Sequence, residues 1–245
     1  MQPQILMITC DRKPVYIHDS LRSMFSQDSN VSQAHIVVCG SVEPNAKFLT
    51  EYEERQDCKF YVHRPNTYER DMCSRSNNYT RIVRNTIRAI DLSDDDKPVI
   101  FCEDDCKFSK NWLQRTLKIV GILPSVTTEY QRTAGNEFVL ALYSPYEHKP
   151  ERLGYAEYHP NDFFGNVCLY MTPGAKKTIV AYMKAEIDKP GHAPCDILVK
   201  KACWDNQIPI FAIAPSVVDH TGDSSSKGNT EVIRAPSFNP EEPLM

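Results

Sequence analysis

The sequence lacks the features that mark several large classes of protein. Its 28 Lys and Arg residues are outnumbered by 32 Asp and Glu residues, for a formal net charge of -4. It therefore has no basic excess of the kind that a nucleic-acid-binding surface needs. No apolar run is long enough to span a membrane, and residues 1–8 do not resemble a signal peptide. These absences predict a soluble, cytoplasmic protein with neither a nucleic-acid partner nor a membrane span.

Two glycine patterns and a cysteine pattern are also missing. No Gly-x-Gly-x-x-Gly follows an expected strand, which disfavours a Rossmann dehydrogenase. Residues 10–13 read Cys-Asp-Arg-Lys, without the glycine-rich loop that sugar nucleotidyltransferases usually carry after their first strand. The nine cysteines show no regular disulfide spacing and favour a reducing compartment. Zinc held by Cys102, Cys106, Cys195 and Cys203 is a weaker alternative, because Cys-x-x-Cys spacing is absent.

The chain contains alternating apolar runs and helical repeats. Strands are expected at residues 5–10, 34–39, 59–63, 99–102, 137–143, 166–171 and 208–214, and helices at 15–25, 46–54, 79–90, 109–120, 173–186 and 194–203. Residues 65–76 are polar and are predicted to form a loop, and Ser109 is the expected N-cap of its helix. This alternation predicts an α/β fold, with a mostly parallel Rossmann-like sheet flanked by helices.

The most informative segment is an apolar strand that ends in three acids. Val99–Cys102 is followed directly by Glu103, Asp104 and Asp105. Packing gains nothing from three adjacent carboxylates, because their desolvation and mutual repulsion both cost free energy. Ligands of open α/β sheets bind beyond the carboxyl ends of the strands, where such acids can hold a divalent cation and, through it, a diphosphate. The alternative is that Asp104 and Asp105 merely cap the next helix.

Several motifs in a fixed order carry a family resemblance. They are Ile8-Thr9-Cys10-Asp11-Arg12, the helix with Asn78, Tyr79 and Arg81, Glu103-Asp104-Asp105, Gly165–Met171, Pro194–Leu198 and Pro215–Gly222. Together they resemble the GT-A fold of DxD-type, nucleotide-sugar-dependent glycosyltransferases, and their spacing is similar to inverting, lipopolysaccharide-type enzymes. The resemblance covers nearly the whole chain. It rests on the order of the motifs, since no single motif is specific.

The resemblance implies an activity and a division of the chain. The expected reaction moves a sugar from a nucleotide-diphosphate sugar, a UDP-sugar above all, to a hydroxyl of a glycan or glycoconjugate, with inversion. A single glycosyltransferase domain over residues 1–245 would contain a nucleotide-binding half (1–106), an acceptor and catalytic half (107–220) and a flexible tail (221–245) that folds over the donor. The alternatives are a sugar nucleotidyltransferase and a non-catalytic carbohydrate-binding protein of the same fold.

The resemblance also implies a metal site and a donor site. Asp105 is the first choice as a direct ligand of Mn²⁺ (or Mg²⁺), with Glu103 and Asp104 reaching the metal through water or touching the donor. His220 would close the site, and its imidazole nitrogen would favour Mn²⁺, although a lone histidine is usually structural. The remaining candidate donor contacts are Thr9, Cys10 and Arg12 for the base and ribose, Asn78 and Arg81, and Ser225 and Lys227 on the diphosphate. Solvent exposure is the competing interpretation for Arg81 and for the tail.

Inverting transfer needs a carboxylate that accepts the proton of the attacking hydroxyl. Asp196 is the first candidate, because it begins a helix whose dipole keeps an acid ionised. A plain helix-start acid is the equal alternative, and Asp162 is the second candidate. Tyr155 and Tyr158 could form a stacking floor for a sugar ring, with core packing as the competing interpretation.

Overall fold

The structure is a computed structural model. It describes residues 2–9, 16–33, 35–40, 46–56, 58–63, 66–74, 76–126, 128, 136–145, 154–159, 162–222 and 233–241. The strands are β1 (Gln4–Thr9), β2 (His35–Gly40), β3 (Lys59–His63), β4 (Val99–Glu103), β5 (Cys106–Phe108), β6 (Val139–Ala141), β7 (Gly154–Glu157), β8 (Cys168–Met171), β9 (Ile210–Ala214) and β10 (Val218–His220). The helices are α1 (Ile17–Gln27), α2 (Ala46–Glu53), α3 (Thr67–Ser74), α4 (Asn78–Asp91), α5 (Trp112–Val120), α6 (Pro173–Glu186) and α7 (Cys195–Asp205), with 3-10 turns at Ser29–Gln33 and Leu123–Ser125.

In the described residues, one central sheet has the strand order β3-β2-β1-β4-β8-β6-β9-β7, and a second small sheet pairs β10 with β5. β1, β2, β3 and β4 pair in parallel, as do β6 and β9, whereas β8 is antiparallel to β4 and β6, and β7 to β9. The sheet is therefore mostly parallel, as predicted. Its shared carboxyl edge collects the ends of β1 and β4 and the start of β8.

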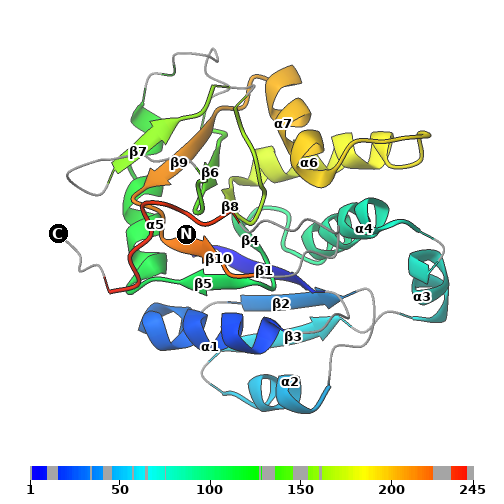
Figure 1. Cartoon of the computed structure of the whole chain (residues 1–245), viewed down its shortest axis with the longest axis horizontal. Helices are drawn as coiled ribbons and strands as arrows, with labels where there is room; N and C mark the ends of the chain where they lie inside the picture. Colours follow the sequence, from blue (N-terminus) through cyan, green and yellow to red (C-terminus); the bar gives the residue numbers. More distant parts are fainter. Residues whose placement is uncertain are drawn as a thin grey trace.

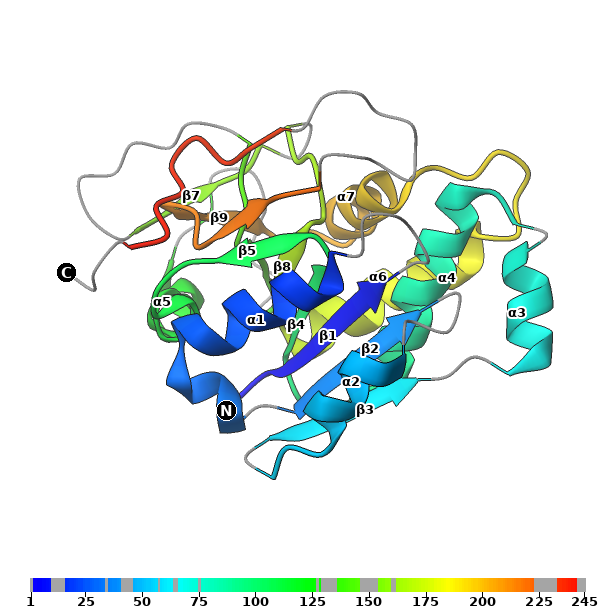
Figure 2. The same cartoon turned by 60° about the horizontal axis from the view of Figure 1, so that its bottom comes forward.

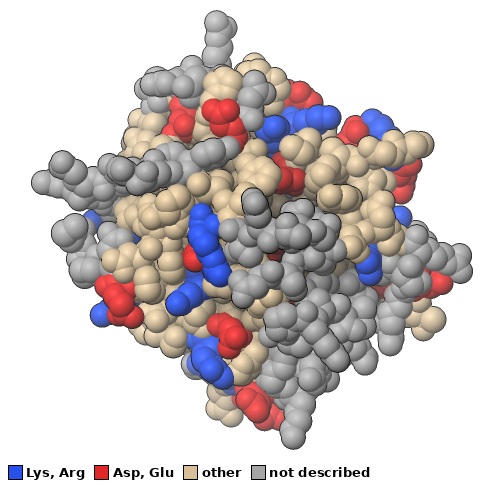
Figure 3. Space-filling model, in the orientation of Figure 1, with Lys and Arg blue, Asp and Glu red and all other residues tan. Residues whose placement is uncertain are grey.

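Helices cover both faces of the sheet (Figures 1 and 2). Ile5 and Met7 of β1 face a core that includes residues of α1 and α5, whereas Leu6 and Ile8 face a core that includes α4, α6 and α7. This alternation explains why β1 and β4 read as continuous apolar runs. On the face shown in Figure 3, the described Lys and Arg side chains are interspersed with Asp and Glu rather than gathered into one basic surface.

The predicted loop at residues 65–76 is wrong, because α3 occupies most of it. The Asn66 side chain accepts a hydrogen bond from the Glu69 N–H (2.9 Å), and the Glu69 carboxylate accepts one from the Asn66 N–H (2.7 Å). This reciprocal pair is a capping box, which satisfies two backbone donors at the helix start. The Asn-x-x-Glu spacing was the available signal, and the polar composition concealed it.

Ser109 does not cap α5, which begins three residues later at Trp112. Asp28 supplies the cap instead, and its Oδ2 accepts hydrogen bonds from the N–H groups of Leu113 (3.0 Å) and Gln114 (3.1 Å). The Ser109 hydroxyl accepts a hydrogen bond from Arg115 (3.1 Å). A carboxylate distant in sequence thus replaces the local cap, and Asp104 and Asp105 do not cap this helix either.

The sequence patterns also missed three short strands. β7 lies within the aromatic stretch that was expected to be irregular. β5 directly follows the acid cluster, and β10 ends with the candidate histidine. Each has only three or four residues, too few for a visible alternation. Among the described residues, no helix has the length and apolar character that crossing a bilayer requires.

Candidate active site

The parallel pairing of β1 with β4 places Ile8 opposite Glu103. Thr9 therefore ends its strand beside the acid cluster, and its hydroxyl donates a hydrogen bond to Oδ2 of Asp104 (2.5 Å). The Ser20 hydroxyl of α1 donates to the backbone carbonyl of Asp104 (2.6 Å). Asp104 is buried. Its carboxylate faces Thr9, and the two hydrogen bonds hold the turn after β4 from the side of β1 and from the side of α1.

His220 reaches the acid cluster through the small second sheet. β10 pairs antiparallel with β5, and this register sets His220 opposite Cys106. The imidazole Nε2 of His220 lies 3.0 Å from Oδ2 of Asp105. The backbone N–H and the hydroxyl of Thr221 both donate to the Asp105 carbonyl, at 2.8 and 2.9 Å. Two residues far apart in the chain are thus joined by strand pairing.

Glu103, Asp105 and His220 each offer one ligand atom, and these atoms lie within 4.8 Å of one another. In the described part of the chain no other three His, Cys, Asp or Glu side chains converge in this way, so the alternative zinc site is not supported. Two carboxylate oxygens and one imidazole nitrogen form a donor set suited to Mn²⁺. Asp104 lies outside this group.

Gly222 allows the chain to pass close to Asp105. A Cβ at this position would lie 2.3 Å from Oδ2 of Asp105, far inside the van der Waals limit. A residue without a side chain is therefore needed for the backbone to pass this close to the carboxylate, which His220 also contacts. The residues present therefore fit a divalent cation in their chemistry and in their clearance.

Asp196 lies in the first turn of α7, and its Oδ1 accepts a hydrogen bond from the N–H of Ile197 (3.0 Å). The neighbouring Cys195 is buried. Burial raises the pKa of the Cys195 thiol to about 12, and the negative charges of Glu103 and Asp196 act in the same direction. Asp162 is exposed in the loop between β7 and β8.

The two tyrosines predicted to form a stacking floor for a sugar ring differ in their exposure to solvent. Tyr158 is a core residue, since it is buried, packs edge-on against Phe163 and donates from its hydroxyl to Ser144 (2.8 Å). It does not form an open stacking floor. Tyr155 is 38% exposed and Phe164 is 46% exposed, so these two rings are accessible.

Asn78 and Arg81 lie in the first turn of α4, where the Arg81 guanidinium donates to the Asn78 side chain. Because α4 leads into the start of the parallel strand β4, its last turn lies at the amino edge of the sheet and its first turn at the carboxyl edge. Of the other donor-site candidates, Thr9 contacts Asp104 as above. Cys10, Arg12, Ser225 and Lys227 lie outside the described residues.

Sequence reasoning missed the residues that surround His220. The Arg234 guanidinium donates to the His220 carbonyl (2.8 Å) and forms an ion pair with Asp219 (3.5 Å). The Tyr143 ring meets the His220 ring edge-on, and the Tyr143 hydroxyl donates to the Ile233 carbonyl (2.7 Å). Burial, and then the charge of Asp219, raises the pKa of Tyr143 far above its ordinary value, so the phenol remains a neutral donor. No local pattern signals these contacts, because each joins separate segments.

Comparison with known proteins identifies the fold. No protein-family model matches the sequence, and no curated protein matches it. The crystal structure of S. aureus TarS 1-349 in complex with UDP superposes with a TM-score of 0.56 over 86% of this chain and 60% of that chain, at 14% identity. A second S. aureus TarS structure gives 0.54, with 12% identity, over 86% of this chain and 36% of that one. The apo structure of WbbM, described as a bifunctional glycosyltransferase, gives 0.49, with 12% identity, over 88% and 39%.

The chain shares the fold of the two TarS structures. It spans between 36% and 60% of the length of the three structures above. In this fold the cluster of Glu103, Asp105 and His220 lies at the carboxyl edge of the central sheet, where ligands of α/β proteins bind.

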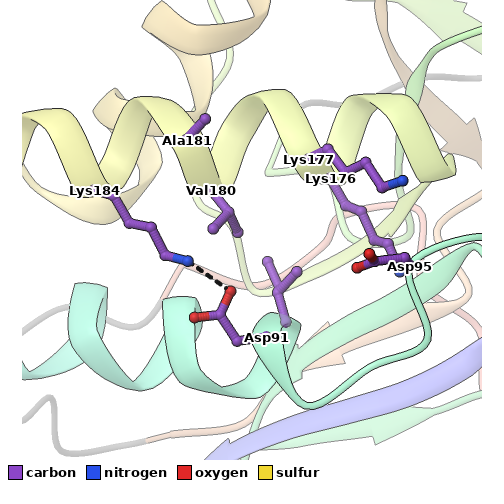
Figure 4. A pocket seen from close by; sticks show the side chains of 8 residues that line it. Asp91, Asp95, Lys176, Lys177, Val180, Ala181 and Lys184 are labelled. Atoms are coloured by element: carbon purple, nitrogen blue, oxygen red, sulfur yellow. Dashed lines mark hydrogen bonds and ion pairs between the residues drawn. The ribbon is translucent and has the colours of Figure 1, made fainter.

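A hollow of about 260 Å³ lies elsewhere, between α4 and α6 (Figure 4). Lys176 donates there to Ser93 and to the Asp94 carbonyl, in the turn before β4, and Lys184 pairs with Asp91 (2.8 Å). The hollow is therefore at the amino edge of the parallel strands, opposite the acid cluster. We do not assign nucleotide-sugar binding to it.

Proposed function

We propose that this chain is a metal-dependent glycosyltransferase that moves a sugar from a nucleotide-diphosphate sugar, a UDP-sugar above all, to a hydroxyl of a glycan or glycoconjugate, with inversion. The observation that carries the proposal is the convergence of Glu103, Asp105 and His220 at the carboxyl edge. The shared fold with TarS, which was crystallised with UDP, supports it. The proposed division of the chain is a nucleotide-binding half (1–106), an acceptor and catalytic half (107–220) and a tail (221–245) that folds over the donor.

Asp105 and His220 would hold Mn²⁺ (or Mg²⁺), with Glu103 beside them. A bound divalent cation neutralises the charge that develops on a nucleoside diphosphate as it leaves. Thr9 and Ser20 keep the acid turn in place by holding Asp104. The turn therefore needs little reorganisation when the donor binds, which is the physical basis of electrostatic preorganisation.

Asp196 would accept the proton of the acceptor hydroxyl as its oxygen attacks the anomeric carbon. It lies in the first turn of α7, where its Oδ1 accepts a hydrogen bond from the N–H of Ile197 (3.0 Å). Asp162 is the second candidate for this role. The other proposed donor contacts are Thr9, Cys10, Arg12, Asn78, Arg81, Ser225 and Lys227.

Ligand-induced thermal stabilisation tests the donor site. UDP, GDP, dTDP and their sugars are added to the protein with and without Mn²⁺, because a ligand that binds the native state raises the melting temperature. We expect a shift that requires both a uridine diphosphate and Mn²⁺, followed by metal-dependent release of sugar from the matching donor. If no nucleotide shifts the melting temperature, with or without Mn²⁺, the proposed metal site is wrong.

Two variants localise the effect. Asp105→Asn is expected to remove the Mn²⁺-dependent shift, and His220→Asn to weaken the preference for Mn²⁺ over Mg²⁺. Asp188→Asn is the matched control, because this acid is 86% exposed and pairs with Arg84 on α4. Equal Mn²⁺ responses in Asp105→Asn and Asp188→Asn would exclude Asp105 as a ligand.

A further inference from the structure

A buried chain of three polar side chains includes the residue that directly precedes the proposed catalytic Asp196. Asn166 precedes β8, Cys195 begins α7, and Thr86 lies within α4, and each is at most 3% exposed. The Asn166 Nδ2 is 3.1 Å from the Cys195 sulfur, and the Thr86 Oγ1 is 3.5 Å from the same sulfur. Thr86 also lies 2.9 Å from the Ile82 carbonyl. The chain therefore links three separate elements of the fold.

The hydrogen-bond inventory gives this chain a single direction. Thr86 has one hydroxyl proton, which it donates to the Ile82 carbonyl one helical turn earlier. Its oxygen is therefore the acceptor toward Cys195, and the Cys195 S–H is the donor. The sulfur in turn accepts from the Asn166 amide. The relay thus runs from Asn166 through Cys195 and Thr86 to the Ile82 carbonyl.

Two members of the relay, Asn166 and Cys195, are each followed in the chain by a residue of the proposed site or one bonded to it. Asn166 is followed by Val167, whose carbonyl accepts a hydrogen bond from the N–H of Glu103 (2.9 Å). Cys195 is followed by Asp196. Because burial holds the pKa of Cys195 at about 12, the thiol remains a protonated donor at neutral pH. The relay therefore connects the strand edge that carries Glu103 to the helix end that carries Asp196.

We propose that Cys195 is a positioning residue for sugar transfer, which through Asn166 and Thr86 fixes Asp196 relative to Glu103. This inference rests on the proposed function, since it assigns the general base to Asp196. A base must lie within hydrogen-bond reach of the proton that it abstracts. An error of about 1 Å in such a placement costs roughly 100-fold in rate, so a thiol that touches no substrate can still set the turnover.

The test compares two cysteines of the same helix. Cys203 also lies in α7 and is completely buried, and burial alone raises its pKa. Cys195→Ala is expected to lower kcat by about 10- to 100-fold while the donor KM changes less than about twofold. Cys203→Ala, which removes the same atoms from the same helix, is expected to keep kcat near the wild-type value. Cys195→Ser is expected to recover most of the lost kcat, because a hydroxyl can fill both hydrogen-bond roles.

The S–H stretching band gives a readout that does not depend on turnover. The difference between the infrared spectra of the wild type and Cys195→Ala isolates the band of this thiol. Thr86→Val removes the acceptor at nearly constant volume, so the band is expected to move to higher frequency. An unchanged band in Thr86→Val would overturn the relay.

The outcomes separate the two proposals. If the wild type transfers sugar and Cys195→Ala is as fast as Cys203→Ala, the positioning role of Cys195 is wrong and the proposed function stands. If the wild type neither transfers nor hydrolyses any nucleotide sugar, the proposed function is wrong and the role of Cys195 in transfer is overturned with it. A band shift in Thr86→Val would then still establish the hydrogen bonds themselves.

Discussion

The position of the Asp105 carboxylate depends on the contacts that it makes and also on the missing side chain of Gly222. His220 approaches Oδ2 of Asp105 to 3.0 Å, and Thr221 holds the Asp105 backbone carbonyl. Gly222 passes so close that any side chain would displace the carboxylate. The three consecutive residues after Asp219 thus act on one acid in three different ways, through an imidazole, a hydroxyl and a missing Cβ.

Gly222→Ala is expected to weaken Mn²⁺ binding by about tenfold or more, because changes in the residues that orient a metal ligand typically cost about 10- to 100-fold in affinity. Calorimetric titration with Mn²⁺ measures this change. Gly121→Ala is the control, since a Cβ there would meet no atom closer than 3.6 Å. Equal Mn²⁺ affinities in the two variants would contradict the predicted clash with Asp105.

Asp196→Asn is expected to retain donor binding and lose transfer by about 10²- to 10⁴-fold, the usual contribution of a general base. The amide keeps the shape of the side chain but cannot accept the proton of the acceptor. Steady-state kinetics and donor calorimetry separate the two effects. Asp162→Asn is the comparison, and a larger loss of transfer in that variant would move the base to Asp162.

At the scale of elements, helix starts are decided by whichever oxygen reaches the first N–H groups. α3 begins with a local capping box, whereas α5 takes its cap from Asp28, more than eighty residues away in the chain. Arg88 of α4 donates to Oε1 of Glu69 (2.9 Å), and His63 at the end of β3 lies 3.3 Å from Oε2 of the same carboxylate. Glu69 therefore joins three elements near the edge of the sheet.

This arrangement predicts a pH-dependent contribution of Glu69 to stability. Burial raises the pKa of Glu69, but the Asn66 N–H, Arg88 and His63 outweigh it and hold the pKa below the ordinary value of 4.5. A carboxyl with a lowered pKa in the folded state stabilises the fold above its unfolded pKa, and this stability is lost as the pH falls through the folded pKa. Glu69→Gln is therefore expected to be less stable than the wild type at pH 7.

Urea denaturation at a series of pH values measures this difference. The gap between wild type and Glu69→Gln should narrow as the pH falls below about 4.5, because a protonated Glu resembles Gln. A gap that stays constant from neutral to acid pH would show that charge at Glu69 does not stabilise α3.

At the scale of the whole molecule, residues 233–241 return across β10 and join the site to the core. Ala235 is buried in the core that also contains β1 and α1 residues, and Phe238 packs against it. The N–H of Ala235 donates to Asp219 (2.8 Å), next to His220. The N–H of Lys110 donates to the Pro240 carbonyl (2.9 Å), which fixes the segment at the start of α5.

Phe238→Ala is expected to lower the free energy of unfolding by about 2 kcal/mol, which is less than the loss when a fully buried Phe is truncated. The variant is also expected to bind Mn²⁺ more weakly. The second effect follows because the same segment holds Asp219 and the His220 carbonyl. Met183→Ala, in the other core, should cost about 3 kcal/mol without changing Mn²⁺ affinity. Chemical denaturation and Mn²⁺ titration measure both quantities. Mn²⁺ affinity that falls equally in the two variants would reflect general loss of stability alone.

Much of the fold could be predicted from local patterns. α6 spans residues 173–186 and β3 spans residues 59–63, both as expected, because each has an apolar pattern and clear end signals. The mostly parallel sheet followed from the alternation of these elements. The loop assigned to residues 65–76 was wrong because composition was given more weight than the Asn-x-x-Glu spacing.

The candidate site, like the fold, was predicted only in part. The position of Glu103, Asp104 and Asp105 at a strand end was visible in the sequence, since strand and acids are adjacent. The different directions of these carboxylates were not visible. Asp104 is engaged by Thr9 and Asp105 by His220, and each contact depends on which strand lies alongside.

Local sequence patterns specified most of the longer strands and helices, and the acid cluster at the end of a buried strand. Hydrophobic periodicity and helix-end chemistry act between residues a few positions apart, so they can be seen without the fold. Only the tertiary structure decided that β10 pairs with β5 and brings His220 to Asp105 across 115 positions of the chain. Strands of three residues carry too little local pattern to specify a partner, so this pairing depends on the packing of the surrounding core.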